Sequence, residues 1–135
     1  MKTSNNTLGA SNLSDKERAD YDFYATDPIA INHLLKEMPE LKQCKSILEP
    51  CAGIGTLADR FTKLTGTPVD MYDIVSRRED INECDYMKLN CKNKYDLIIT
   101  NFPYKEGTKK EPIGFSELLY KSLQDVTPGG YVCSF

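Results

Sequence analysis

Short apolar stretches alternate with amphipathic patterns along most of this chain. Five stretches have the length and composition of buried strands, namely 46–49, 69–73, 81–85, 95–100 and 131–135. Three other segments carry apolar residues at helical spacing, and these are 28–38, 57–64 and 115–123. Strands that alternate with helices predict a parallel sheet with crossover connections. We therefore expect an α/β fold of the Rossmann-like, doubly wound type with a mostly parallel sheet.

Cap and turn residues support these boundaries. Asp27 followed by Pro28 predicts the start of the first helix, because an acidic N-cap and a proline at the first helical position are both favoured there. Pro39 predicts the end of that helix. Pro128-Gly129-Gly130 predicts a turn directly before the last strand.

The first residues differ in composition from the rest of the chain. Residues 1–13 carry few apolar groups, and Ser14 with Glu17 has the spacing of a capping box. We expect a flexible tail and a short helix over 1–20, followed by one domain over 21–135. A chain of 135 residues, 40% of them hydrophobic, is long enough to bury one core. Its formal net charge of −3 means that nucleic acid would have to bind at a local basic surface.

The cysteines favour free thiols. They number five, contain no C-x-x-C pair and accompany a single histidine, which supports neither a zinc site nor a complete disulfide framework. We expect a reducing, cytoplasmic setting and no metal. We also expect no membrane contact, because the sequence shows neither a run long enough to span a bilayer nor a secretory core.

A glycine-rich turn, Glu49-Pro50-Cys51-Ala52-Gly53-Ile54-Gly55, follows the first expected strand. Glycines let the backbone approach a ligand, and the N-terminus of the next helix offers unpaired N–H groups. The turn favours a nucleoside cofactor. Residues 53–58 also fit the dinucleotide pattern, with Asp73 about twenty residues further on. An NAD site and a turn without any ligand therefore stay open on this motif alone.

Polar groups end the later strands as well. Asp73 closes the second strand, where a carboxylate can accept hydrogen bonds from ribose hydroxyls. Asp85, followed by Tyr86, closes the third, where a carboxylate can accept from the exocyclic amine of an adenine. Asn101-Phe102-Pro103-Tyr104 follows the fourth strand and combines an amide, a rigid carbonyl and an aromatic ring. That combination suits a planar exocyclic amine.

Taken together, these motifs resemble those of the S-adenosylmethionine-dependent amino-methyltransferases, most closely the small phage-type and bacterial DNA adenine-N6 methyltransferases. The matches lie in the family's order over about residues 20 to 135. They are Asp22-Phe23-Tyr24-Ala25-Thr26-Asp27-Pro28, the glycine turn, the two aspartates, and 101–104 as the family's (Asp/Asn/Ser)-Pro-Pro-(Tyr/Phe/Trp) motif. The resemblance implies a class I methyltransferase fold.

The resemblance also implies methyl transfer to N6 of an adenine that has left the DNA helix. Asn101 and the Phe102 carbonyl would accept the N–H bonds of the amine, Pro103 would complete the motif, and Tyr104 would stack on the base. The S-adenosylmethionine-binding residues that it implies are Tyr24, Thr26, Glu49, Pro50, Gly53, Gly55, Asp73, Ile74, Asp85, Tyr86 and Asn101.

The chain departs from the family pattern at two points. Phe102 replaces the usual proline, which loosens the backbone and adds bulk near the expected target pocket. The sequence stops at Phe135, within the fifth strand, so we expect a domain truncated at its C-terminus and an exposed edge strand suited to homodimer pairing.

Other functions stay open at this point. A protein-glutamine or RNA-guanine methyltransferase would use the same Asn-x-Pro-Tyr geometry. An NAD-dependent oxidoreductase would explain the glycine turn and Asp73 but not residues 101–104. A catalytically silent remnant that binds cofactor or DNA would explain Phe102 and the early C-terminus.

Overall fold

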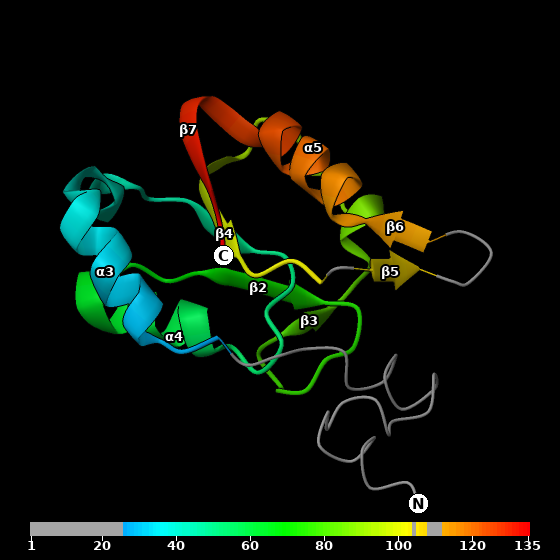
Figure 1. Ribbon diagram of the computed structural model, residues 1–135, viewed down its shortest axis with the longest axis horizontal. Helices are drawn as coiled ribbons and strands as arrows, with labels where there is room; N and C mark the ends of the chain where they lie inside the picture. The colour runs from blue at the N-terminus through cyan, green and yellow to red at the C-terminus, as the bar shows by residue number, and fades with distance from the viewer. Residues whose placement is uncertain (1–25, 104, 108–111) are drawn as a thin grey trace, which may run out of the picture.

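A five-stranded, all-parallel sheet forms the centre of the molecule (Figure 1). The computed structural model describes residues 26–103, 105–107 and 112–135. The strands of the sheet are β1 (Ile47–Glu49), β2 (Asp70–Asp73), β3 (Asn82–Glu83), β4 (Tyr95–Thr100) and β7 (Val126–Ser134). Their spatial order is β3-β2-β1-β4-β7. The expected α/β class and parallel sheet are confirmed, and the order is compatible with a Rossmann-like fold.

Helices cover both faces of the sheet. In Figure 1, α3 (Ile29–Glu37) and α4 (Thr56–Thr65) lie together on one side, and α5 (Phe115–Asp125) lies on the other. Strand β4 supplies both cores, because alternate side chains point to opposite faces. Leu97 and Ile99 pack with residues of α3 and α4, whereas Ile98 packs with Leu118 of α5.

The first helix, expected over 28–38, runs from Ile29 to Glu37, and Pro28 is its N-cap residue. The Asp27 carboxylate accepts a hydrogen bond from the Ile29 N–H at 3.0 Å, and the Asp27 carbonyl accepts one from the Ala30 N–H. Pro39 then starts the short 3-10 helix η2 (Pro39–Gln43). A second 3-10 helix, η3 (Tyr86–Lys88), follows β3. Neither 3-10 helix was expected from the sequence, since segments of five and three residues are too short to show the spacing of a hydrophobic helix face.

The last strand is longer than the sequence predicts. It starts at Val126, and the segment Pro128-Gly129-Gly130 lies inside it as an irregularity. Tyr95 pairs with Val126 and Leu97 with Tyr131, so the intervening residues of β7 bulge out of the ladder. Gly129 has a φ of 82°, which glycine adopts without strain. The turn residues therefore bend the strand instead of preceding it.

A hairpin follows β4 that the sequence did not predict. Strand β5 (Lys105–Gly107) pairs antiparallel with β6 (Pro112–Gly114), and β6 leads directly into α5. The two strands form their own sheet beside α5 (Figure 1). Several expectations fall outside the described residues, namely the tail and short helix over 1–20, Tyr24 and Tyr104.

The described part of the chain contains no helix long and apolar enough to cross a membrane. No disulfide joins the five cysteines, all of which lie in that part. The expectation of thiols is confirmed in this respect. Burial raises the pKa of the Cys91 thiol to about 12, because desolvation and the Asp125 carboxylate both disfavour the thiolate.

Candidate functional site

The expected site residues gather along the carboxyl edge of the sheet. Because all five strands are parallel, the ends of β3, β2, β1 and β4 meet at one edge in that order. Asp85, Asp73, the turn 49–55 and Asn101 therefore follow one another across it. Neighbouring strands are ~4.8 Å apart, so this row spans roughly 14 Å from β3 to β4. The edge includes the gap between β1 and β4, where strand order reverses and α/β sheets bind ligands.

The glycine turn is held in shape from the outside by Arg78. Its guanidinium donates to the Ile54 carbonyl at 3.0 Å and pairs with Asp59 and Asp80. Gly55 has a φ of 85°, and a Cβ added to it would lie 2.5 Å from Arg78 Nη1. The left-handed backbone favours glycine here, and any side chain would also displace the Arg78 guanidinium. Arg78 was not expected from the sequence, because Ile54 and Asp59 are 24 and 19 positions away from it.

Glu49 is buried at the start of α4. Its side chain is 2% exposed, and Oε2 accepts a hydrogen bond from the Ala58 N–H at 2.9 Å. The N-cap residue of α4 is Gly55, which has no side chain, so Glu49 supplies the capping bond from β1. Burial raises the pKa of Glu49 well above its ordinary value, and the nearby Asp59 and Asp73 raise it further. The helix N-terminus is thus already occupied by a carboxyl group.

Asp73 connects β2 to the glycine turn. Its Oδ2 accepts the Gly53 N–H at 2.8 Å, and its Oδ1 accepts the Val75 N–H at 3.1 Å. Arg77 Nη1 lies 3.6 Å from Oδ1. Each carboxylate oxygen has two lone pairs, so both retain capacity to accept a further hydrogen bond. Asp73 therefore fixes the turn and can still bind hydroxyl groups.

Asp85 and Tyr86 face different surroundings although they are adjacent in sequence. Asp85 is partly exposed, and its Oδ1 accepts the Met87 N–H at 3.0 Å to cap η3. The Tyr86 side chain is 1% exposed and lies in the core beneath α5. Its hydroxyl donates to Asp125 at 2.7 Å, and burial raises its pKa. Because its side chain is buried, Tyr86 can contribute only its backbone groups next to Asp85.

Exposed apolar side chains also follow the strands whose ends carry these polar groups. Ile54, Ile74, Val75 and Met87 follow β1, β2 and β3, and each is between 37% and 44% exposed. Large apolar side chains left in solvent are informative when they gather at a candidate site. Of these four, only Ile74 was expected to bind cofactor; Ile54 lies inside the glycine turn, and Val75 and Met87 belong to no motif. The edge therefore offers apolar surfaces next to carboxylates.

Asn101 is held from a distant segment of the chain. Its Nδ2 donates to Thr26 Oγ1 at 3.1 Å, which joins the residues before α3 to the end of β4. The preceding Thr100 is fully buried, and its hydroxyl donates to the Cys51 carbonyl at 3.2 Å. Two of the expected cofactor residues, Thr26 and Asn101, are thus brought into direct contact.

The Phe102 ring lies in the core and not on the surface of the site. It is 3% exposed and packs edge-on against Phe115, with ring centroids 5.8 Å apart. The expectation that this ring adds bulk near a target pocket is wrong, because the ring fills the space between β4 and α5. Pro103 follows it and is partly exposed.

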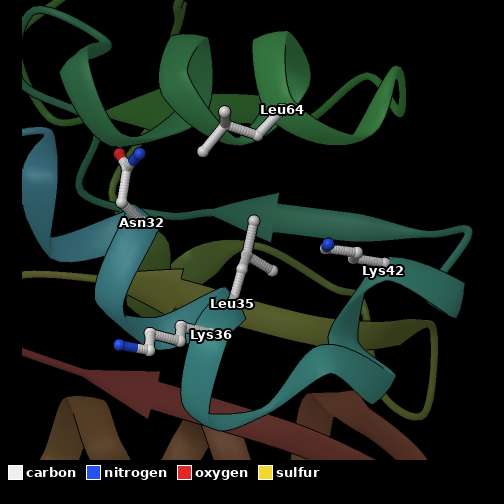
Figure 2. Close-up of a pocket in the computed structure, with 5 residues that line it drawn as sticks. All are labelled: Asn32, Leu35, Lys36, Lys42 and Leu64. Atoms are coloured by element: carbon white, nitrogen blue, oxygen red, sulfur yellow. The ribbon is translucent and has the colours of Figure 1, made fainter.

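The described residues also form a cavity of about 250 Å³ that contains none of the candidate residues. It is lined by Asn32, Leu35, Lys36, Lys42 and Leu64 (Figure 2). Figure 2 shows Leu35 on α3 and Leu64 on α4, and Leu64 is near the C-terminal end of α4. The cavity therefore lies away from the glycine turn, which precedes the N-terminus of that helix. No three His, Cys, Asp or Glu side chains group as metal ligands within 26–103, 105–107 and 112–135.

Comparison with protein-family models finds no match for this chain, and neither does comparison with curated protein sequences.

Proposed function

We propose that this chain is an S-adenosylmethionine-dependent N-methyltransferase with a class I methyltransferase fold, and that its substrate is N6 of adenine in DNA. The observation that carries the cofactor assignment is the bond between the Glu49 carboxyl group and the Ala58 N–H at 2.9 Å. This bond uses an N–H group at the helix N-terminus that a dinucleotide would need for its pyrophosphate.

A dinucleotide needs N–H groups for its pyrophosphate at the glycine turn and at the helix N-terminus. Here Gly53 donates to Asp73, Gly55 to the Ala52 carbonyl and Ala58 to Glu49. Ala52 itself donates to the Tyr72 carbonyl at 2.9 Å. These four N–H groups are satisfied within the protein. The Asp73 carboxylate, which accepts from Gly53, would repel a dianionic pyrophosphate and would attract a sulfonium or ammonium cation.

The adenosine end of the cofactor suits the neighbouring strands. Asp73 keeps acceptor capacity for ribose hydroxyls, and Asp85 Oδ2 accepts from no other described residue in the structure. Ile74 and Met87 offer exposed apolar surface for the faces of an adenine ring. Glu49, Pro50, Gly53, Gly55 and Thr26 complete the set that we assign to the cofactor.

When bound, S-adenosylmethionine would supply a methyl group from its sulfonium. The electron pair of the broken carbon–sulfur bond would stay on sulfur, and the lone pair of the substrate amine would form the new bond to the methyl carbon. Asn101 Oδ1 and the Phe102 carbonyl accept the N–H bonds of that amine and favour a pyramidal nitrogen. The nitrogen then loses its surplus proton to solvent, so no strong base is needed. Tyr104 would stack on the substrate base.

The choice of DNA rests on the resemblance of residues 22–28 and 101–104 to adenine-N6 methyltransferases. A duplex substrate must release its base from the stack, at a cost of a few kcal/mol. RNA-guanine and protein-glutamine substrates use the same amine chemistry, and the experiment below compares all three.

The test is transfer of a labelled methyl group from S-adenosylmethionine to unmethylated DNA, RNA or protein. We expect label in adenine N6 of DNA. Asn101→Ala should reduce transfer by about 100-fold or more while cofactor affinity stays nearly unchanged. Asn90→Ala, at an exposed asparagine outside the site, is the matched control. Asp73→Ala should abolish cofactor binding.

Two results would count against this function. Full transfer by Asn101→Ala would remove the amide from the reaction. Binding of S-adenosylmethionine without transfer to any of the three substrates would instead favour the silent binding module.

A further inference from the structure

The hydrogen bond between Asn101 Nδ2 and Thr26 Oγ1 joins two residues 75 positions apart at the edge of the sheet. We propose that Thr26 is a positioning residue, which fixes the orientation of the Asn101 amide so that its oxygen faces the substrate amine. This inference rests on the proposed methyl transfer and assigns Thr26 a role in orienting the reacting groups, in addition to cofactor contact.

The orientation matters because the two ends of an amide have opposite hydrogen-bonding character. The Asn101 oxygen accepts, whereas its NH₂ group donates. An amine held for methylation presents N–H bonds, so it needs the oxygen. If the amide rotated by half a turn, its NH₂ group would face the N–H bonds of the substrate and repel them.

The torsion at the end of an asparagine side chain is broad and nearly two-fold, so the backbone alone does not select one orientation. In the structure the Thr26 hydroxyl oxygen accepts the Nδ2 hydrogen at 3.1 Å, so Oδ1 is the end of the amide that Thr26 does not hold. The bond is partly buried, and water therefore competes with it less than at an exposed site.

Thr26 is well supported for such a role. It directly precedes Asp27, whose carboxylate and carbonyl both accept N–H bonds from the first turn of α3. That helix is anchored by Ile31 and Leu35, which are buried in the core. On the other side, Asn101 follows Thr100, whose side chain is bound to the Cys51 carbonyl. Both partners of the bond are thus attached to rigid elements.

A purely structural bond between α3 and β4 would give the same geometry, and a symmetric side chain separates the two roles. The carboxylate created by Asn101→Asp has two equivalent oxygens, so it presents an acceptor to the substrate in either orientation. If Thr26 orients the side chain at position 101, its loss should lower kcat when that side chain is asparagine and hardly change kcat when it is aspartate.

The kinetic test is a double-mutant cycle of Thr26→Val and Asn101→Asp, with kcat measured at saturating cofactor and cofactor affinity measured separately. Thr26→Val should lower kcat by about five- to tenfold in the natural background, as expected for one lost hydrogen bond. The same change should lower kcat less than twofold with Asn101→Asp. Thr26→Ser keeps the hydroxyl and should keep kcat. Equal losses in both backgrounds would overturn the orienting role.

A second readout does not depend on turnover. In protein labelled with [15N]asparagine, the side-chain NH₂ signal of Asn101 is identified by its disappearance in Asn101→Asp. We expect Thr26→Val to shift that signal and speed its exchange with water, and Thr26→Ser to leave it in place. An unchanged signal in Thr26→Val would overturn the proposal. A protein without any methyl transfer but with the expected shift would contradict the proposed function and leave the hydrogen bond supported.

Discussion

Replacing Phe102 tests how this chain holds the backbone after β4, at a position where the methyltransferase motif that it resembles has proline. The ring is 3% exposed and packs against Phe115 at an interplanar angle of 83°. We expect buried packing to supply the rigidity that a proline ring would otherwise give the backbone. Phe102→Ala removes the ring and leaves a cavity between β4 and α5.

The magnitude follows from burial. Truncating a buried phenylalanine to alanine costs about 3–5 kcal/mol, which includes lost transfer free energy and the cavity. Phe115 is 37% exposed, so Phe115→Ala should cost less, about 1–2 kcal/mol. The edge-on contact between the rings should appear as a coupling of about 0.5–1.5 kcal/mol. Since domains of this size unfold with about 5–15 kcal/mol, the first change is large.

The assay is urea unfolding at equilibrium, followed by circular dichroism, for both single variants and the double variant. Tyr120→Ala is a suitable control because that ring is on the same helix and 65% exposed. Phe102→Pro introduces the proline of the motif that residues 101–104 resemble but loses the same burial. Reduced chain entropy would return at most about 1 kcal/mol, so this variant should also be clearly less stable than the natural protein.

A loss below about 1 kcal/mol in Phe102→Ala would refute this reasoning, because it would place the ring outside a packed core. Phe102→Pro with unchanged or higher stability would show that backbone rigidity, and not packing, governs this position.

Three further outcomes follow from individual contacts. Because burial raises the pKa of Glu49, the folded protein holds this proton more tightly than the unfolded chain, and stability is lost as pH rises above the ordinary value of 4.5. Glu49→Gln should be more stable than the natural protein at pH 8 in urea unfolding, with the gap closing toward pH 4.5. Gly55→Ala should lower stability by more than about 1 kcal/mol, because φ is 85° and the Arg78 guanidinium occupies the space. Asp125→Ala should cost about 3–5 kcal/mol, because it strands the Lys121 ammonium that lies 2.8 Å from Asp125.

Each of these outcomes has a contrary result. An unfolding free energy of Glu49→Gln that runs parallel to the natural protein at all pH values would show that Glu49 titrates normally. Thermal denaturation of Gly55→Ala at the natural midpoint would show that the turn tolerates a side chain. If the double variant Lys121→Met, Asp125→Leu were as unstable as Asp125→Ala alone, the unpaired Lys121 ammonium would not be the cause of the lost stability.

The sequence predicted those elements whose signal is local. Strand β4 was predicted with its bounds, since 95–100 is rich in apolar and β-branched residues and contains one charged residue, Asp96. The helix α3 was predicted within one residue at each end, from Asp27-Pro28 before it and Pro39 after it. The site edge was also predictable, because strand ends in a parallel sheet meet at one edge, and polar groups followed each of the four strands.

Features that depend on distant partners were not predictable. The burial of Tyr86 depends on Asp125, 39 positions away, and the capping of α4 depends on Glu49 in β1. The hairpin β5–β6 lies in a polar stretch without the alternation that marks a half-buried strand. The contact between Thr26 and Asn101 likewise has no trace in either local segment.

Calorimetric titration with S-adenosylmethionine and with NAD tests the central claim most directly. The N–H groups of Gly53 and Ala58 are already bound by Asp73 and Glu49, and the Asp73 carboxylate would repel a pyrophosphate, so we expect saturable heat with S-adenosylmethionine and none with NAD. Asp73→Ala should remove that heat. Saturable binding of NAD without binding of S-adenosylmethionine would contradict the account.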